Sequence, residues 1–555
     1  MFRRFVAFIS REILSIHKAA YLIGLASLAS VLLGLLRERL LVAYLGRGEL
    51  LDVYYAAFKL PDLLFTVFIS IISAFVLIPI LNKKEDDDAR YAFLDSLLSV
   101  FITAAFFVAL AAFIFTPNYL SALFPSLYHG SHGLELLLLS RLFLLQFIFL
   151  GAAHIFMALL QFRQRFIAYA FVPLVYSLSI ILSLVYLYPY FGVKGLAFGV
   201  VFGAFLQLVL SFAIASFVPR LNWSKINWKD IKDMLKVSYP RSMALFLQES
   251  VQLIIFSLLS FVSSGALSAF KLAYTLQAAP LSVIAVSYSV AAFPTLSRLH
   301  SKGDIKSFVE HVEAALRHIL FWLTPIVSYT IVFRAHIVRI IYGTQNFTWD
   351  DTRIVAAVLA ISMFTLLFLS ISILLARAYY AAGMTKTPLL IYAASLPLLP
   401  AFYFLIKNMF IHYTQTRHFA ESLLKVSGVE NMSIVSMALA HLLTLSVSSI
   451  LFMYLFRKYF MSDKKWQIFT ISVKQMLLAS VVSALFAKWL LIYLSDFYIL
   501  DNLQSVILHM LSAFVPAAIL FVLVLYVFDN LELRETLRIL KHQWNQIRKK
   551  YGISA

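Results

Sequence analysis

Apolar runs of roughly 20 residues recur along this chain from Tyr21 to Phe528, and short polar stretches separate them. In helical form, at 1.5 Å per residue, a run of that length crosses a bilayer core of about 30 Å. A backbone in lipid must satisfy its own hydrogen bonds, and runs of this length do so as α-helices. The sequence therefore predicts an all-α integral membrane protein with about 14 transmembrane helices.

Composition excludes a soluble fold. Of the 555 residues, 62% are hydrophobic and only 13% are charged, which is about half the charged share of a soluble domain. One soluble core cannot hide so much apolar surface, so the remainder must face lipid. The predicted spans are centred near Val31, Phe68, Ala105, Phe149, Ser177, Phe205, Ile254, Ile284, Pro325, Met363, Ser395, Thr444, Val482 and Ala517.

The loop charges predict an orientation. An even number of spans places both termini on one side, and most of the lysines and arginines between spans also fall on that side. The positive-inside rule assigns that side to the cytoplasm. The net charge of +19 is therefore mainly a topology signal, not the footprint of a nucleic-acid partner. The basic stretches are 3–18, 83–90, 163–165, 220–236, 298–306, 457–465 and 534–550.

Both ends of the chain are predicted to be amphipathic. Residues 1–18 place apolar side chains at helical spacing between basic ones, which is typical of a helix on a membrane surface. Residues 531–555 form a basic cytoplasmic tail that can hold anionic lipid. One face of this tail carries Leu533, Leu537, Leu540 and Trp544.

No motif for enzymatic chemistry occurs in the sequence. The chain has no cysteine, which excludes disulfides and thiolate sites. It has no phosphate-binding glycine-rich loop, no HExxH pair and no nucleophile elbow. The 13 histidines are scattered, and His154, inside a span, is expected to pack against a neighbour. We therefore expect a transporter with no catalytic residue, metal or cofactor.

The informative residues are charged groups inside apolar spans. Such groups are costly at membrane depth, so they usually face a wet cavity or a partner. The densest cluster comprises Arg37, Glu38, Arg39, Asp52, Lys59 and Asp62, of which Arg39 is expected at the membrane interface. Asp52 and Lys59 lie seven positions apart, about two helical turns, and so share one helix face. The alternative for Arg37 is a position at the interface that ends the first span by snorkelling.

Two charged residues lie deeper in later spans. Glu249 and Lys271 are each either an ion or substrate contact or one half of a structural pair, and the sequence does not choose between these roles. The residues predicted to gate or kink the spans are Gly34, Pro61, Pro79 and Pro280. Breaks of this kind permit bending in transporters, although a plain packing kink is the alternative.

Several ordered motifs resemble one family. They are Gly34-Leu-Leu-Arg-Glu38, Asp52-Val-Tyr-Tyr-Ala-Ala-Phe-Lys-Leu-Pro-Asp62 followed by Pro79, Arg165-Phe166 through Pro173, Phe293-Pro-Thr-Leu-Ser297, Tyr342-Gly343 with Phe347-Thr348, and Arg377 through Gly383 with Lys386-Thr-Pro388. Each motif is weak alone, but the ordered set is specific. The set resembles the MurJ/MviN family of lipid II flippases, in the larger MOP exporter superfamily.

The resemblance implies an architecture and an activity. It implies two six-helix lobes around a central cationic cavity, with an N-lobe over 19–218, a C-lobe over 219–456 and two appended helices over 457–530 that form a groove for a lipid tail. It also implies that the protein moves an undecaprenyl-diphosphate-linked peptidoglycan precursor from the inner to the outer leaflet by alternating access. The implied location is the bacterial cytoplasmic membrane.

The chain departs from the family pattern at several basic positions. The first-span Ser30 is followed by Val31, a basic pair is replaced by Phe65 and Thr66, and a further arginine is replaced by Thr275. Lys271 lies one helical turn before Thr275, so it could present its charge to the same cavity. Lysine keeps the charge but loses the bidentate geometry that arginine offers to phosphate.

These expectations define the predicted function and its alternatives. The substrate-binding residues would be Arg37, Lys59 and Lys271. Coupling would use Na+, H+ or the membrane potential, and the other partners would be membrane lipids and cell-wall synthesis proteins. The alternatives are a flippase for another polyprenyl-linked oligosaccharide, a cation-coupled exporter, and a non-transporting scaffold for cell-wall synthesis, whose cavity charges would be dispensable. The residues expected to balance charge or couple an ion are Glu38, Asp52, Asp62 and Glu249.

Overall fold

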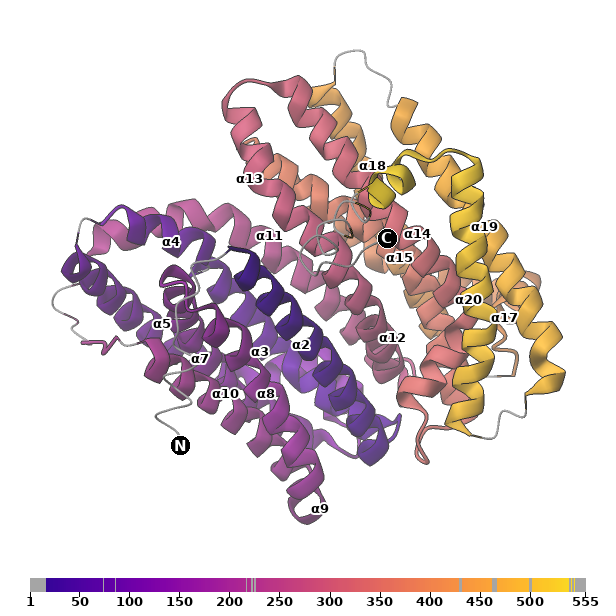
Figure 1. The fold of residues 1–555 in the computed structure, drawn as a ribbon. Coiled ribbons are helices and arrows are strands. Elements are labelled where there is room, and N and C mark those ends of the chain that lie inside the picture. Colours follow the sequence, from indigo (N-terminus) through magenta and orange to yellow (C-terminus); the bar gives the residue numbers. More distant parts are fainter. Residues whose placement is uncertain are drawn as a thin grey trace. The chain divides into compact units, whose positions relative to one another are not determined.

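The computed structural model describes residues 16–538, 541 and 544, with gaps at 73, 85, 216, 221–222, 224–225, 429–431, 462–466 and 499–501. Every regular element in these residues is a helix (Figure 1). Thirteen spans in the described part are long and apolar enough to cross a membrane. Each contains one of the predicted centres from Phe68 to Ala517, and Val31 lies in a further helix, α2 (Ile16–Leu45). The all-α membrane fold is thus confirmed, whereas most of the predicted surface helix over 1–18 lies outside the described residues.

The first compact unit comprises the chain up to Leu272, with the short segments Thr344–Thr348 and Tyr392–Leu396. Its core is built mainly from buried residues of the segments 74–82, 87–123 and 133–162, around Phe93 and Phe147. Its elements are α2, α3 (Glu49–Ile71), α4 (Ala74–Asn82), α5 (Asp87–Leu123), α6 (Pro125–Tyr128), α7 (Gly133–Phe162), α8 (Phe166–Tyr186), α9 (Tyr188–Phe191), α10 (Val193–Ala215), α11 (Trp228–Ser260) and the start of α12 (Ala266–Pro280).

Two glycines allow α10 to approach α8 closely. A Cβ atom on Gly199 would lie 1.9 Å from Ser183 Oγ, and one on Gly203 would lie 2.8 Å from Ser179 Cβ. The Ser179 hydroxyl donates a hydrogen bond of 3.0 Å to the Gly199 carbonyl. Small residues four positions apart are typical of close helix contacts in membranes. This contact holds α8, which carries Tyr176 of the cavity described below.

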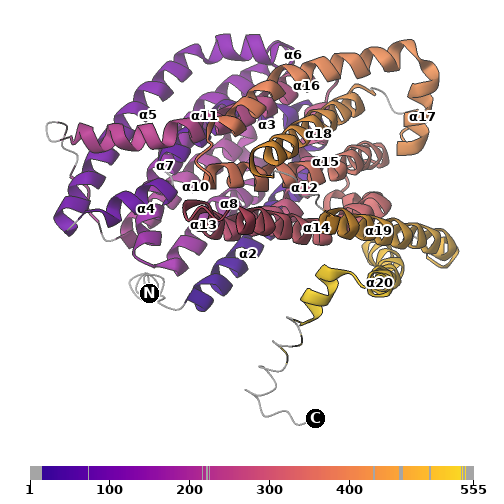
Figure 2. The same ribbon diagram turned by 90° about the horizontal axis from the view of Figure 1, so that it is seen from above.

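The second unit comprises Ala273–Gly343, Trp349–Ile391 and the chain from Pro397 onward. One of its cores lies between α14, α19 and α20, around Met476, Ala513 and Phe521, and these helices run side by side in Figures 1 and 2. The elements are a π-helical turn (Leu281–Val286), α13 (Ser287–Ser301), α14 (Ile305–Tyr342), α15 (Trp349–Ala381), α16 (Lys386–His412), α17 (Thr414–Leu424), α18 (Ser433–Phe460), α19 (Gln467–Leu494), a 3-10 turn (Ser495–Phe497) and α20 (Leu503–Val527).

The predicted kink residues lie at distinct backbone features. Pro61 is buried inside α3, and Pro79 lies inside α4. Pro280 ends α12, and a π-helical turn follows it directly. Proline removes an i→i−4 hydrogen bond, and π-turns are common where membrane helices change direction or serve a function. The gating role of these residues stays a prediction.

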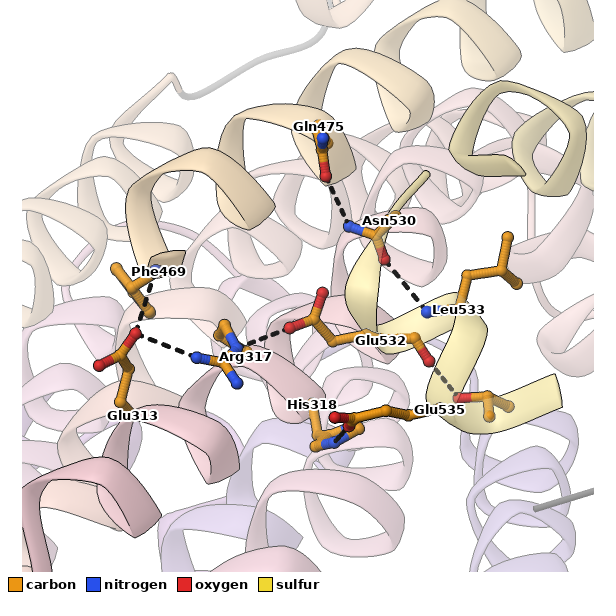
Figure 3. Close-up of polar contacts among 10 residues, drawn as sticks. Glu313, Arg317, His318, Phe469, Gln475, Asn530, Glu532, Leu533 and Glu535 are labelled. Atoms are coloured by element: carbon orange, nitrogen blue, oxygen red, sulfur yellow. Dashed lines mark hydrogen bonds and ion pairs between the residues drawn. The ribbon is translucent and has the colours of Figure 1, made fainter. Parts of the chain in front are cut away.

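Within the second unit, a buried polar cluster attaches the segment after α20 to α14 (Figure 3). Arg317 of α14 donates from Nε to Glu532 Oε1 at 2.6 Å and from Nη1 to Glu313 Oε1 at 3.0 Å. Glu313 Oε1 also accepts from the backbone N–H of Phe469 in α19. Glu532 is fully buried and belongs to a helical segment over 531–538.

The cap of that helical segment adds a second attachment. The Asn530 side chain accepts from the backbone N–H of Leu533 and donates to Gln475 of α19 at 3.0 Å. Leu533 is buried, whereas Leu537 and Trp544 are exposed. Leu540 lies outside the described residues. The amphipathic character predicted for residues 531–555 beyond this first turn stays a prediction.

Candidate functional site

A polar cavity of about 240 Å³ lies within the first unit. It brings together five of the predicted site residues, namely Arg37, Glu38, Lys59, Asp62 and Lys271, from α2, α3 and α12. These residues come from opposite ends of the segment Met1–Leu272 of this unit, yet they line one cavity. The remaining lining residues are Tyr54, Tyr55, Phe58, Phe65, Gln146, Leu150, Tyr176 and Phe256.

Arg37 and Glu38 form a pair at the cavity wall. Arg37 Nη2 donates to Glu38 Oε1 at 2.8 Å, and the Tyr55 hydroxyl donates to Glu38 Oε2. Glu38 is 1% exposed, and each of its carboxylate oxygens accepts a hydrogen bond from a protein donor. The Arg37 side chain keeps 26% of its surface accessible, and its buried Nε has no hydrogen-bond partner among the described residues. Arg37 therefore has donor capacity left for an anionic ligand.

Lys59 lies against an aromatic face. Its Nζ is 3.8 Å from the ring centroid of Phe256 in α11, within the range of a cation–π contact. Asp62, Lys271 and Glu249 interact electrostatically with Lys59. Glu249 is not part of the cavity lining, but it lies close enough to Lys59, Asp62 and Lys271 to act on their charges. The structure thus groups four of these charges with Arg37 and Glu38 in one region of the first unit.

Asp52 is not part of the cavity lining, and it binds the start of α12 instead. Its carboxylate accepts backbone N–H bonds from Gly265 at 2.8 Å and from Ser268 at 2.7 Å, and it is 1% exposed. These donors belong to the first turn of α12, where backbone N–H groups lack partners within the helix. Arg47 donates to the Gly265 carbonyl at 3.1 Å. Asp52 therefore fixes the start of α12, the helix that carries Lys271.

Replacing Asp52 with alanine should lower the free energy of unfolding by about 2–3 kcal/mol, because two charge-assisted hydrogen bonds to buried N–H groups are lost. Thermal unfolding of the purified protein measures this change. Glu49, one turn earlier on α3, accepts from Ser131 at the surface, so Glu49→Ala is the matched control and should cost less than about 1 kcal/mol. Equal losses in both variants would contradict the capping role.

Sequence reasoning missed the uncharged residues of the cavity. Tyr54, Tyr55 and Tyr176 look like ordinary span residues, and Gln146 lies in a leucine- and phenylalanine-rich run. Gln146 could have been found, because it is a polar residue within an apolar span. Its buried Oε1 atom has no hydrogen-bond partner in the described chain. Phe65 occupies a position where the family pattern is basic, and it lines the cavity. Phe65 also contacts His154 edge-on at 5.2 Å, as expected for a packed histidine.

A second, largely apolar pocket of about 950 Å³ lies in the second unit. It is formed by α15, α18 and α19, and Ile450, Met453 and Ile471 are among its apolar residues. Arg457 is the basic residue of its lining. Such a pocket suits an acyl or prenyl chain, because its apolar side chains can pack against a hydrocarbon chain.

The fold and the charged cavity define a polytopic helical membrane protein with a polar site among its spans. A solved structure titled "Lipid II flippase MurJ, inward closed conformation" matches with a TM-score of 0.70 and 21% identity, covering 93% of this chain and all of that one. An inward-facing MATE family multidrug resistance transporter of the MOP superfamily matches with a TM-score of 0.62 and 13% identity, covering 77% of this chain and 93% of that one.

The sequence comparisons identify the family. The family model described as lipid II flippase MurJ matches residues 41–511. A protein of Bdellovibrio bacteriovorus named "Probable lipid II flippase MurJ" is 27% identical over 391 residues, covering 68% of this chain and 74% of that protein. A protein of Rickettsia prowazekii with the same name is 25% identical, covering 68% and 75%. The chain belongs to the MurJ family of lipid II flippases, which are bacterial multi-pass membrane transporters and not enzymes.

Proposed function

We propose that this protein translocates lipid II by alternating access and holds its diphosphate in the cavity of the first unit. The observation that carries the proposal is the convergence of Arg37, Lys59 and Lys271 on one cavity inside a membrane protein. A diphosphate needs cationic donors in a site of low dielectric. Arg37 supplies a guanidinium with unused donors, and the two lysines supply compact positive charges.

The charge balance of the lining fits an anionic ligand that must also be released. The lining carries three cations and the two carboxylates Glu38 and Asp62, which leaves one net positive charge. Glu249 lies nearby and would bring the balance to zero when ionised. We assign Asp62 and Glu249 to charge balance or to coupling with Na+, H+ or the membrane potential, because transport against a gradient requires an energy source and the sequence has no ATPase motif. Asp52 would act indirectly, by holding α12.

The lipid tail is assigned to the apolar pocket of the second unit. Its walls come from α15, α18 and α19, and Arg457 is the charged residue of its lining. This assignment refines the predicted groove of residues 457–530, since only α19 of the two appended helices contributes to the lining. The division into lobes at 218 and 456 and the cytoplasmic location of both termini remain parts of this proposal.

Rescue of a bacterium depleted of its own lipid II flippase tests the function. The native chain should restore growth and cell shape, and accessibility of lipid II at the outer leaflet should return in parallel. No rescue by a well-expressed and correctly inserted chain would reject lipid II as the substrate. That outcome would favour a substrate with another polyprenyl-linked head group, or the non-transporting scaffold. In the first case Phe65, which lines the cavity where the family pattern is basic, would be a candidate for the altered head-group specificity.

Lys271 is the residue proposed to compensate for the missing family arginine. Lys271→Ala should reduce the transport rate at least about tenfold, because one charge-assisted contact to the diphosphate is lost. The matched control is Lys229→Ala, an exposed lysine at the start of α11, which should transport normally. Full transport by the Lys271 variant would remove this residue from the site.

A further inference from the structure

A cationic pocket in the second unit has no role in the function above. It has a volume of about 430 Å³ and lies between the C-terminal part of α14, the start of α15 and the end of α17. These three parts lie at the same end of the unit, opposite the end at which α14 begins. The lining residues include Arg334, Arg353, Lys425, Ser422 and Trp349.

The two arginines are held in place by backbone carbonyls. Arg353 donates from Nε to the Lys425 carbonyl at 3.0 Å and from Nη2 to the Ser427 carbonyl at 2.7 Å. Arg334 donates from Nη2 to the Leu424 carbonyl at 3.3 Å. These contacts use only part of the five N–H donors of each guanidinium. Both arginines are therefore fixed in position while retaining hydrogen-bond capacity.

The lining of the pocket contains three cations, Arg334, Arg353 and Lys425, and no carboxylate. Asp350, outside the lining, pairs with Arg353 at 3.2 Å. The nearby Glu421 forms an ion pair with Arg417, whose Nε donates to Glu421 Oε1 at 2.7 Å. This hydrogen bond holds the pKa of Glu421 below its usual range, so the ion pair stays intact at neutral pH and contributes no net charge.

An apolar face accompanies the cations. Phe419 and Leu423 lie four positions apart on α17 and are 70% and 65% exposed, and Trp349 is 60% exposed. The opposite face of α17 is turned to the protein, where Glu421 is buried. A short amphipathic helix with exposed apolar residues beside basic ones is typical of an interfacial helix, and tryptophan favours the same depth. Figure 2 shows α17 following α16 and turning across its direction.

We propose that this pocket binds the phosphate of an anionic phospholipid, with α17 lying in the interface of the leaflet opposite the termini. Phe419 and Leu423 enter the acyl region, and Trp349 lies at headgroup level. Arg334, Arg353 and Lys425 then surround the phosphate. The site acts as a lipid anchor for the segment between α16 and α18, independent of the substrate cavity in the first unit.

Quenching of Trp349 fluorescence by brominated lipids tests the site directly. The full chain carries seven tryptophans, so the variant used retains Trp349 and has phenylalanine at the other six positions. In vesicles, brominated phosphatidylglycerol should associate about tenfold more strongly than brominated phosphatidylcholine. Lys425→Gln should lower that preference about fivefold, because one cation near the membrane surface is worth about 1 kcal/mol. Glutamine does not alter the backbone requirement of this position, whose φ is +59°.

The controls separate the alternatives. Lys194→Gln, an exposed lysine at the start of α10 in the first unit, should leave the preference unchanged. Phe419→Gln with Leu423→Gln should weaken quenching by both lipids without altering their ratio. Equal quenching by both lipids in the unmutated pocket, or an unchanged preference in Lys425→Gln, would overturn the proposal. If added inorganic phosphate abolished the preference for phosphatidylglycerol, and chloride of equal ionic strength did not, the site would be assigned to free phosphate and the lipid proposal would be overturned. None of these readouts depends on transport.

Discussion

Arg317→Met should destabilise the attachment of the segment after α20 by about 3–5 kcal/mol, because the substitution leaves a buried carboxylate without its cation. Glu532 is fully buried, and Arg317 is its charged partner at 2.6 Å. One oxygen of Glu532 already lacks a hydrogen-bond partner in the described chain, and the other accepts from the Arg317 guanidinium. Hydrogen exchange of the backbone amides over 531–538 measures the effect, which should exceed about 100-fold in the opening equilibrium.

A compensating variant distinguishes the buried charge from lost packing. Replacing Glu313 and Glu532 with glutamine in the Arg317→Met background removes the unpaired charges, and it should recover most of the protection. Arg534→Met is the matched control, because Arg534 is about half exposed and pairs with an exposed aspartate. Normal protection in Arg317→Met, or no recovery in the triple variant, would show that the cluster in Figure 3 does not hold this segment.

The sequence predicted the positions of the helices, but only some of the contacts that their charged residues make. Hydropathy locates every span from Phe68 onward, because the bilayer thickness fixes the length of an apolar run. Asp52 and Lys59 share one helix face, which predicts that both side chains reach the same cavity. Seven residues are about 10 Å along the axis, however, and this distance takes Asp52 from the cavity to the first turn of α12, where free N–H groups accept a carboxylate.

Contacts between distant helices could not be predicted. Arg317 and Glu532 are 215 positions apart, and the sequence around either residue does not indicate the other. The same applies to Phe256, which covers Lys59 from another helix. Periodicity reports the environment of a residue along its own helix, whereas a partner on another helix depends on packing that one sequence does not encode locally.

Arg37→Ala should lower transport by at least about 30-fold in the rescue assay, which corresponds to about 2 kcal/mol for a charge-assisted contact in a partly buried site. The loss should concern the ligand and not the fold, because Glu38 retains the Tyr55 hydroxyl as a donor. Arg37→Lys keeps the charge and loses the planar donor geometry, so it should transport at an intermediate rate.

The neighbouring arginine provides the matched control for this substitution. Arg39 is two positions away on α2 and is not part of the cavity lining, and Arg39→Ala should rescue as the native chain does. A loss that is equal in both variants would point to insertion or stability of α2 instead of ligand binding. Full transport by an equally expressed Arg37→Ala protein would retain the family's activity and exclude Arg37 from it. Loss in Arg37→Ala alone would instead show that a cavity with fewer arginines than the family pattern still works through a cation on the first helix.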